Sequence, residues 1–263
     1  MDDFLIMRPF GPLFFTVFAV FLLILIVASR LLRNKSEKTK ALVIAVSCWI
    51  TLLGFAAYKY ALSVDAEYNI ITADMGGFNW WGELPIQLCN INLLLIPIAV
   101  LTRKRPLLGF CFFVGPIGAL MALVLPGNGF DGYSILLPRM LGYYGTHFVI
   151  VIAALAIGTF GLYRPRMRDL PMIVLTIVII AFAVFCVNLL LRRTGLHPRA
   201  NYFFSVETEG NPLLELFYHW IPLPFLYLLP SIIILTVYAG MITLGFSLKD
   251  RLGKPESRAK SET

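Results

Sequence analysis

The chain has 263 residues, of which 59% are hydrophobic and 14% are charged, and its mean hydropathy is +0.80. A soluble domain is nearer half apolar and a quarter charged, so this composition excludes an ordinary cytosolic enzyme, a disordered protein and a secreted disulfide scaffold. The 22 Lys and Arg outnumber the 15 Asp and Glu, but they lie at the ends of apolar runs. That placement indicates membrane topology and argues against a nucleic-acid partner.

Seven apolar segments are long enough to cross a bilayer, which takes about 20 helical residues. In chain order they lie near residues 13–31, 41–61, 83–101, 107–125, 138–162, 170–191 and 220–246. The sequence therefore predicts an all-α, polytopic membrane protein: a seven-helix transmembrane bundle over residues 1–248 and a polar tail over 249–263. Pro116 predicts a kink in the fourth span, and Pro222, Pro224 and Pro230 predict a bend or break in the last.

The basic residues also predict the orientation of the bundle. Sixteen of the 22 fall in the tail and in the connections that follow the first, third and fifth spans. Because an excess of Lys and Arg marks the cytoplasmic side, we expect the N-terminus outside and the tail in the cytoplasm. Asp2 and Asp3 precede the first span and its basic cluster follows it, so this span is predicted to be a retained helix rather than a signal peptide.

Polar side chains within the spans are costly in hydrocarbon and therefore need an explanation. The third span carries most of them: Glu83, Gln87, Cys89, Asn90 and Asn92. A regular helix cannot turn all of these away from lipid at 100° per residue, so the third span is predicted to lie at the centre of the bundle. The fifth span adds His147, with Tyr143 and Tyr144 one turn away, and the sixth adds Asn188.

Depth arithmetic brings three of these residue types together. Counted from the outer ends of their spans, Cys89 lies about 9 Å and His147 about 13 Å into the membrane, and Asn188 is about one turn from the outer surface. Cys, His and Asn are the components of an activated thiol nucleophile, with Asn92 or Asn188 predicted to orient His147 or to stabilise an oxyanion. The competing interpretation, polar side chains that only join helices around a space-filling cysteine, stays open.

Other chemistry receives no support from the sequence. Cys48, Cys111 and Cys186 lie in apolar stretches and are interpreted as space-filling residues. No CxxC or HExxH spacing, phosphate loop or dinucleotide fingerprint occurs, so no metal and no cofactor is predicted.

The segment between the sixth and seventh spans is long and unusual in composition. Arg192, Arg193 and Arg199 are predicted to bind an anionic lipid head group, because a guanidinium matches the oxygens of a phosphate. Asn211-Pro212 predicts the start of a short capped helix, either a lid over the mouth of the bundle or part of an aromatic belt at the interface. Lys59 and Glu83 lie near the same boundary and are expected to pair.

Several short motifs occur in a recognisable order: Glu83–Asn92, Gly115-Pro116-Ile117-Gly118, Gly145-Thr146-His147, Asn188, Asn201-Tyr202 and Asn211-Pro212-Leu213-Leu214. In these the chain resembles the YwaF-like family of bacterial integral membrane proteins, which is related to transmembrane protein 164 of animals. The resemblance implies a bacterial plasma-membrane protein that moves fatty acyl groups between phospholipids, with Cys89 and His147 as the catalytic residues. The chain departs from the bacterial pattern at Gln87, where a histidine is common.

Two functional hypotheses follow. The first is a lipid acyltransferase or acyl hydrolase that uses a Cys89–His147 dyad on membrane phospholipids or lysolipids. The alternative is a non-enzymatic transporter or binding protein whose polar pocket holds a small solute or a lipid. No Asp or Glu lies deep in any predicted span, which disfavours proton-coupled transport.

Overall fold

The structure, a computed structural model, describes residues 3–73, 76–127 and 129–252. Its α-helices are α1 (Pro12–Leu31), α2 (Glu37–Val64), α3 (Ala66–Ile71), α4 (Ile91–Thr102), α5 (Arg105–Val124), α6 (Pro138–Thr159), α7 (Leu170–Arg193), α8 (Pro212–Trp220) and α9 (Leu229–Leu252). Short 3-10 helices cover Asp3–Leu5, Trp80–Gly82, Met167–Asp169, Tyr202–Phe204 and Leu226–Leu228. Two short strands, β1 (Ile6–Met7) and β2 (Tyr133–Ser134), pair antiparallel and tie the N-terminal segment to the start of α6.

The helices begin where the sequence supplies a cap or a proline. Ser36 accepts a hydrogen bond from the amide of Thr39 at the start of α2. Asn211 caps α8 by accepting from the amides of Leu213 and Leu214 at 3.1 and 3.3 Å, as predicted for this segment. Proline occupies the first turn of α1, α5, α6, α7 and α8, where its missing N–H has no helical partner to lose.

Within the described residues, six helices are long and apolar enough to cross a membrane: α1, α2, α5, α6, α7 and the last helix. The chain is therefore a multi-pass membrane protein. The predicted continuous helix over 83–101 is wrong, because only α4, with 12 residues, is helical there. Pro85 lacks an amide hydrogen, and the amide of Leu84 before it donates to the hydroxyl of Tyr202 instead of to a helical carbonyl.

The last predicted span, 220–246, also differs. Helix α8 ends at Trp220, and α9 begins only at Leu229. Between them Phe225 has a φ of 65°, and Pro222 and Pro224 cannot supply helical amides. The break expected from these prolines is confirmed.

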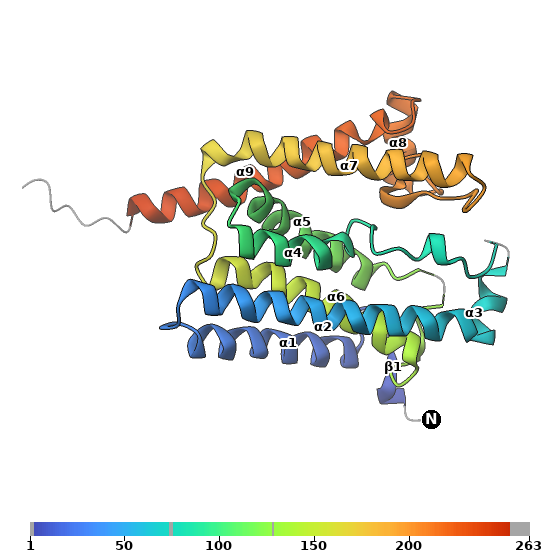
Figure 1. The fold of residues 1–263 in the computed structure, drawn as a ribbon, viewed down its shortest axis with the longest axis horizontal. Helices are drawn as coiled ribbons and strands as arrows, with labels where there is room; N and C mark the ends of the chain where they lie inside the picture. Colours follow the sequence, from blue (N-terminus) through green and yellow to red (C-terminus); the bar gives the residue numbers. More distant parts are fainter. Residues whose placement is uncertain (1–2, 74–75, 128, 253–263) are drawn as a thin grey trace, which may run out of the picture.

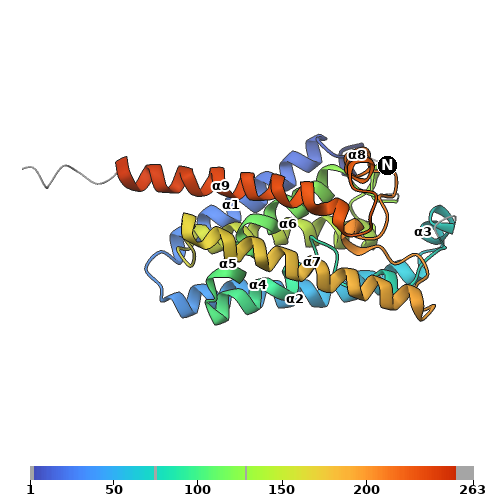
Figure 2. The same cartoon turned by 90° about the horizontal axis from the view of Figure 1, so that it is seen from above.

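Helix α6 lies at the centre of the bundle and contacts α1, α2, α4 and α5 (Figures 1 and 2). Small residues allow these close approaches, since membrane helices pack mainly through shape. A Cβ atom on Gly115 of α5 would come within 2.7 Å of the Cβ of Ala154 on α6. Phe148 of α6 packs against three rings of α1, those of Phe14, Phe18 and Phe21.

The two ends of the bundle differ in content. Both views place α3, α8 and the N-terminal segment at one end, while the turns after α1, α4 and α6 lie at the other (Figures 1 and 2). The basic residues that marked the cytoplasmic side belong to those turns. The assignment of this end to the cytoplasm stays a prediction, and the tail beyond Leu252 lies outside the described residues.

Candidate active site

The non-helical segment 83–90 ends at α4 and positions Cys89 just before that helix. The amide of Ile91 donates to the carbonyl of Gln87 at 2.9 Å, so the chain turns into the helix directly after the cysteine. Gly118 of α5 packs against the backbone of Cys89, where an added Cβ would lie 3.5 Å from the Cys89 nitrogen. Cys89 is half-buried, so part of its surface stays accessible.

The imidazole of His147 meets this thiol from α6. The Nε2 atom of His147 lies 3.3 Å from the Sγ atom of Cys89, and the Nδ1 atom lies 2.7 Å from the carbonyl oxygen of Tyr143. A carbonyl oxygen can only accept, so Nδ1 carries the hydrogen and donates a hydrogen bond to the Tyr143 carbonyl. The lone pair of Nε2 then faces the thiol, which is the tautomer that a general base for Cys89 needs.

The two tyrosines near His147 pack beside the imidazole and donate hydrogen bonds to backbone carbonyls of neighbouring segments. The ring of Tyr143 stacks on Phe130 at a centroid distance of 4.3 Å and lies 4.4 Å from the His147 ring. Its hydroxyl donates to the carbonyl of Ala122 at 2.6 Å. Tyr144 donates to the carbonyl of Phe130 at 3.0 Å and thereby fixes the residue on which Tyr143 stacks.

A buried ion pair lies beside the dyad. Lys59 of α2 pairs with Glu83, as the sequence predicts, and its ammonium also lies 4.5 Å from the centre of the Tyr58 ring. Glu83 belongs to the irregular segment that leads to Cys89, so the ion pair fastens that segment to α2. The site therefore combines a thiol, a base and one paired cation within apolar surroundings.

The two asparagines predicted to orient His147 form hydrogen bonds with other groups. Asn92 donates to the carbonyl of Leu88 at 3.0 Å, while Asn188 bonds only to Tyr202 and Ser205 among the described residues. Both are fully buried, and the group that orients His147 is the backbone carbonyl one turn earlier on its own helix. The spacing of four residues between Tyr143 and His147 was the signal that could have revealed it.

Two amide oxygens near Cys89 have no partner. The Oδ1 atoms of Asn90 and Asn92 are buried and accept no hydrogen bond from any described residue. Asn92 Oδ1 points toward Gly115, because an added Cβ there would lie 3.2 Å away. Unsatisfied acceptors at a buried site need explanation and are suited to a hydroxyl donor, such as water or an alcohol.

The connection between α7 and α8, residues 194–211, covers the irregular segment before Cys89. Tyr202 accepts from the amide of Leu84 at 3.0 Å and donates to the carbonyl of Trp81 at 2.7 Å. Gln87 accepts from the amide of Phe203 at 3.2 Å. Non-helical backbone within a membrane persists only where protein or water satisfies it, and here the α7–α8 connection does so.

Asn188 anchors this connection from α7. It donates to the Tyr202 carbonyl at 2.8 Å and to the Ser205 hydroxyl at 2.9 Å, and it accepts from the Tyr202 amide at 2.9 Å. Phe203 and Phe204 have positive φ angles, which residues with a side chain rarely adopt. The bonds from Asn188 and Gln87 hold this strained turn over the site.

The three arginines predicted to bind a head group have different surroundings. Arg192 donates to the Ala200 carbonyl at 2.7 Å and pairs with Glu207 at 2.6 Å, so it is engaged within the α7–α8 connection. That guanidinium holds the pKa of Glu207 below its ordinary value, and the charge of Arg199 adds to the effect. Arg193 is exposed at the end of α7 and has no ion pair with any described residue. Head-group binding stays a prediction for all three.

The remaining cysteines do not join the site. Cys48 and Cys111 are fully buried in the core, and Cys186 is exposed on α7. Across the part of the chain that the structure describes, no group of three or more His, Cys, Asp or Glu is placed to hold a metal ion.

Comparison with known proteins bears on the family. Residues 7–242 match the TMEM164 family, which spans most of the described bundle including Cys89 and His147. No curated protein and no solved structure matches the chain. The chain belongs to the TMEM164 family.

Proposed function

We propose that this protein is a thiol-dependent lipid acyltransferase or acyl hydrolase of the YwaF-like bacterial subgroup, acting in the plasma membrane. One observation carries the proposal: His147 Nε2 lies 3.3 Å from Cys89 Sγ while its Nδ1 donates to the Tyr143 carbonyl. This geometry is that of a nucleophile, a base and an orienting group. The resemblance to acyltransferases of animals supplies the substrate class, membrane phospholipids and lysolipids.

In the first half of the reaction, Cys89 gives its thiol proton to His147 Nε2 and the thiolate attacks an ester carbonyl carbon of the lipid. A carbon–sulfur bond forms, and the tetrahedral intermediate collapses as the carbon–oxygen bond breaks. The departing alkoxide takes the proton from His147, which leaves an acyl-thioester on Cys89 and a lysolipid.

In the second half, the hydroxyl of another lysolipid, or water, attacks the thioester carbonyl while His147 takes its proton. The carbon–sulfur bond breaks, and the thiolate of Cys89 recovers the proton from Nε2. The acyl group has then moved to a new oxygen. The unpartnered Oδ1 atoms of Asn90 and Asn92 are suited to accept from the incoming hydroxyl.

Paired variants test this assignment in vesicles that contain a phospholipid with an isotope-labelled acyl chain and an unlabelled lysolipid. We expect Cys89→Ala to abolish label transfer and His147→Ala to lower its rate by about 10²- to 10⁴-fold. Cys186→Ala, a cysteine on the exposed side of α7, is the matched control and should retain the rate. Without an acceptor, mass spectrometry should find an acyl adduct on Cys89. Full transfer by both dyad variants would refute the proposal.

The same experiment addresses the alternative of a transporter or binding protein with a polar pocket. Such a protein would show no transfer and no adduct, yet would bind its solute in a manner sensitive to Asn92 or Gln87. Gln87 already accepts from the amide of Phe203, whereas the unpartnered Oδ1 of Asn92 could accept from a solute, so the Asn92 variant is the sharper test of this alternative.

A further inference from the structure

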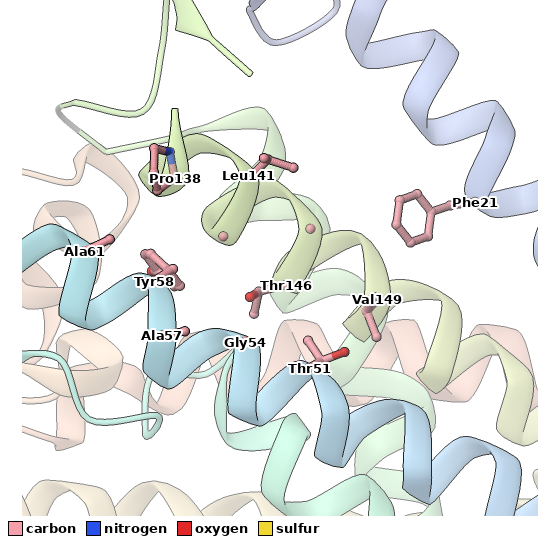
Figure 3. A pocket seen from close by; sticks show the side chains of 12 residues that line it. Phe21, Thr51, Gly54, Ala57, Tyr58, Ala61, Pro138, Leu141, Thr146 and Val149 are labelled. Atoms are coloured by element: carbon pink, nitrogen blue, oxygen red, sulfur yellow. The ribbon is translucent and has the colours of Figure 1, made fainter. Parts of the chain in front are cut away.

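A groove of about 440 Å³ runs between α2 and α6, with Phe21 of α1 near its end at Val149 (Figure 3). Small residues create the space: Gly54, Ala57 and Ala61 on α2, and Gly142 and Gly145 on α6. Gly54, Ala57 and Leu141 of this lining are exposed, so the groove opens sideways from the bundle.

The medium at this opening is the hydrocarbon of the membrane. Both walls belong to helices long and apolar enough to span a bilayer, and the surface of the groove is almost entirely apolar. Along α2 the lining runs from Thr51 to Ala61, which is about 15 Å of helix.

The dimensions of the groove limit what can fill it. The lining follows about 15 Å of α2, which suits an extended hydrocarbon chain lying along the helix. Such a chain would meet an almost entirely apolar surface along that length.

The inner wall of the groove is also a wall of the candidate site. Tyr58 lines the groove and packs onto Gly142, where an added Cβ would lie 2.2 Å from the Tyr58 Cβ. The ring of the same tyrosine lies 4.5 Å from the ammonium of Lys59, which pairs with Glu83 in the irregular segment before Cys89. On α6 the lining runs from Pro138 to Val149 and includes Thr146, so it extends to both sides of the depth of His147.

We propose that this groove binds one fatty acyl chain of a membrane lipid, which enters laterally between α2 and α6 with its ester end toward Tyr58. That this acyl chain belongs to the substrate rests on the proposed function, but the binding of an acyl chain in the groove does not. Tyr58 and Thr146 stand between the groove and the dyad, and the glycines of the groove set the width available to the chain.

The test uses phosphatidylcholine vesicles in which one acyl chain carries a photoreactive diazirine, with the full-length protein bearing Cys89→Ala so that no turnover occurs. We expect crosslinks to concentrate on residues 51–61 and 138–149. Gly145→Leu extends a side chain into the groove, where nothing lies within 4 Å of an added Cβ, and should lower these crosslinks about tenfold. Gly240→Leu on α9, equally free of neighbours, is the matched control and should leave them unchanged.

Labelling spread evenly over the lipid-facing helices, including α7 and α9, would overturn the proposal, as would labelling indifferent to a folded Gly145→Leu protein. The map from the unsubstituted groove decides the matter even if that variant does not fold. Groove labelling without acyl transfer by the wild-type protein would refute the proposed function alone. Acyl transfer with evenly spread labelling would refute the groove alone.

Discussion

Replacement of Asn188 by Ala tests whether the α7–α8 connection is held over the site from α7. The change removes three hydrogen bonds and leaves the amide of Tyr202 without a partner, whereas the Tyr202 carbonyl still accepts from the hydroxyl and the amide of Ser205. A buried backbone group left unpaired costs about 1–3 kcal/mol, whereas measured hydrogen bonds between membrane helices average about 0.6 kcal/mol. We therefore expect the free energy of local opening at residues 202–205 to fall by about 1–3 kcal/mol.

Hydrogen–deuterium exchange in nanodiscs measures that opening directly. Since 1.4 kcal/mol corresponds to a factor of ten, the amides of residues 202–205 should exchange between about 5-fold and about 150-fold faster. Thr176→Ala, which removes a side-chain hydrogen bond from the exposed side of the same helix, is the control and should leave them unchanged. Unaltered exchange in the Asn188 variant, or equal acceleration in both, would refute the reasoning.

Three further outcomes follow from contacts elsewhere. Gly115→Leu should destabilise the bundle by about 1–3 kcal/mol because its side chain would collide with α6, whereas Gly240→Leu should not; equal melting temperatures would contradict this. Lys59→Met should lower the free energy of unfolding by on the order of 3 kcal/mol, because it leaves the Glu83 carboxylate without its partner. Adding Glu83→Gln should restore thermal stability, and an unchanged melting temperature in the Lys59→Met protein would contradict this. The pKa of Glu207 is lowered in the folded state, so its ionised carboxylate stabilises the fold above pH 4.5, the ordinary pKa. This stabilisation is lost as the pH falls from 4.5 through the lowered pKa. Exchange in the α7–α8 connection should then rise on acidification, and Glu207→Gln should abolish that rise.

Sequence reasoning worked where a property depends on one stretch of chain. Long apolar runs such as 107–125 and 138–162 predict α5 and α6 closely, because length and hydropathy alone determine whether a helix can span a bilayer. The cap of α8 was likewise visible in Asn211 and Pro212. Averaged hydropathy failed for the third crossing, because it does not register that Pro85 and the polar side chains near it break the helix.

The proximity of Cys89 and His147 followed from depth arithmetic, although that arithmetic assumed a helical rise that residues 83–90 do not have. The packing of α4 on α6, rather than the rise, brings the two side chains together. Reasoning from side-chain types could not identify the group that orients His147, since it is a backbone carbonyl. It also placed Asn188 in the site, whereas the structure uses this residue to hold the α7–α8 connection.

The hydrogen bonds that complete the third crossing set an order for assembly of the protein. Leu84 and Gln87 find their partners in Tyr202 and Phe203, which are 118 and 116 residues further along the chain. During synthesis, those groups have no such partners until α7 and the segment after it have emerged. The crossing that carries the thiol is therefore finished after its neighbours, so a chain interrupted before Tyr202 would hold Cys89 in the membrane without the contacts that shape its surroundings.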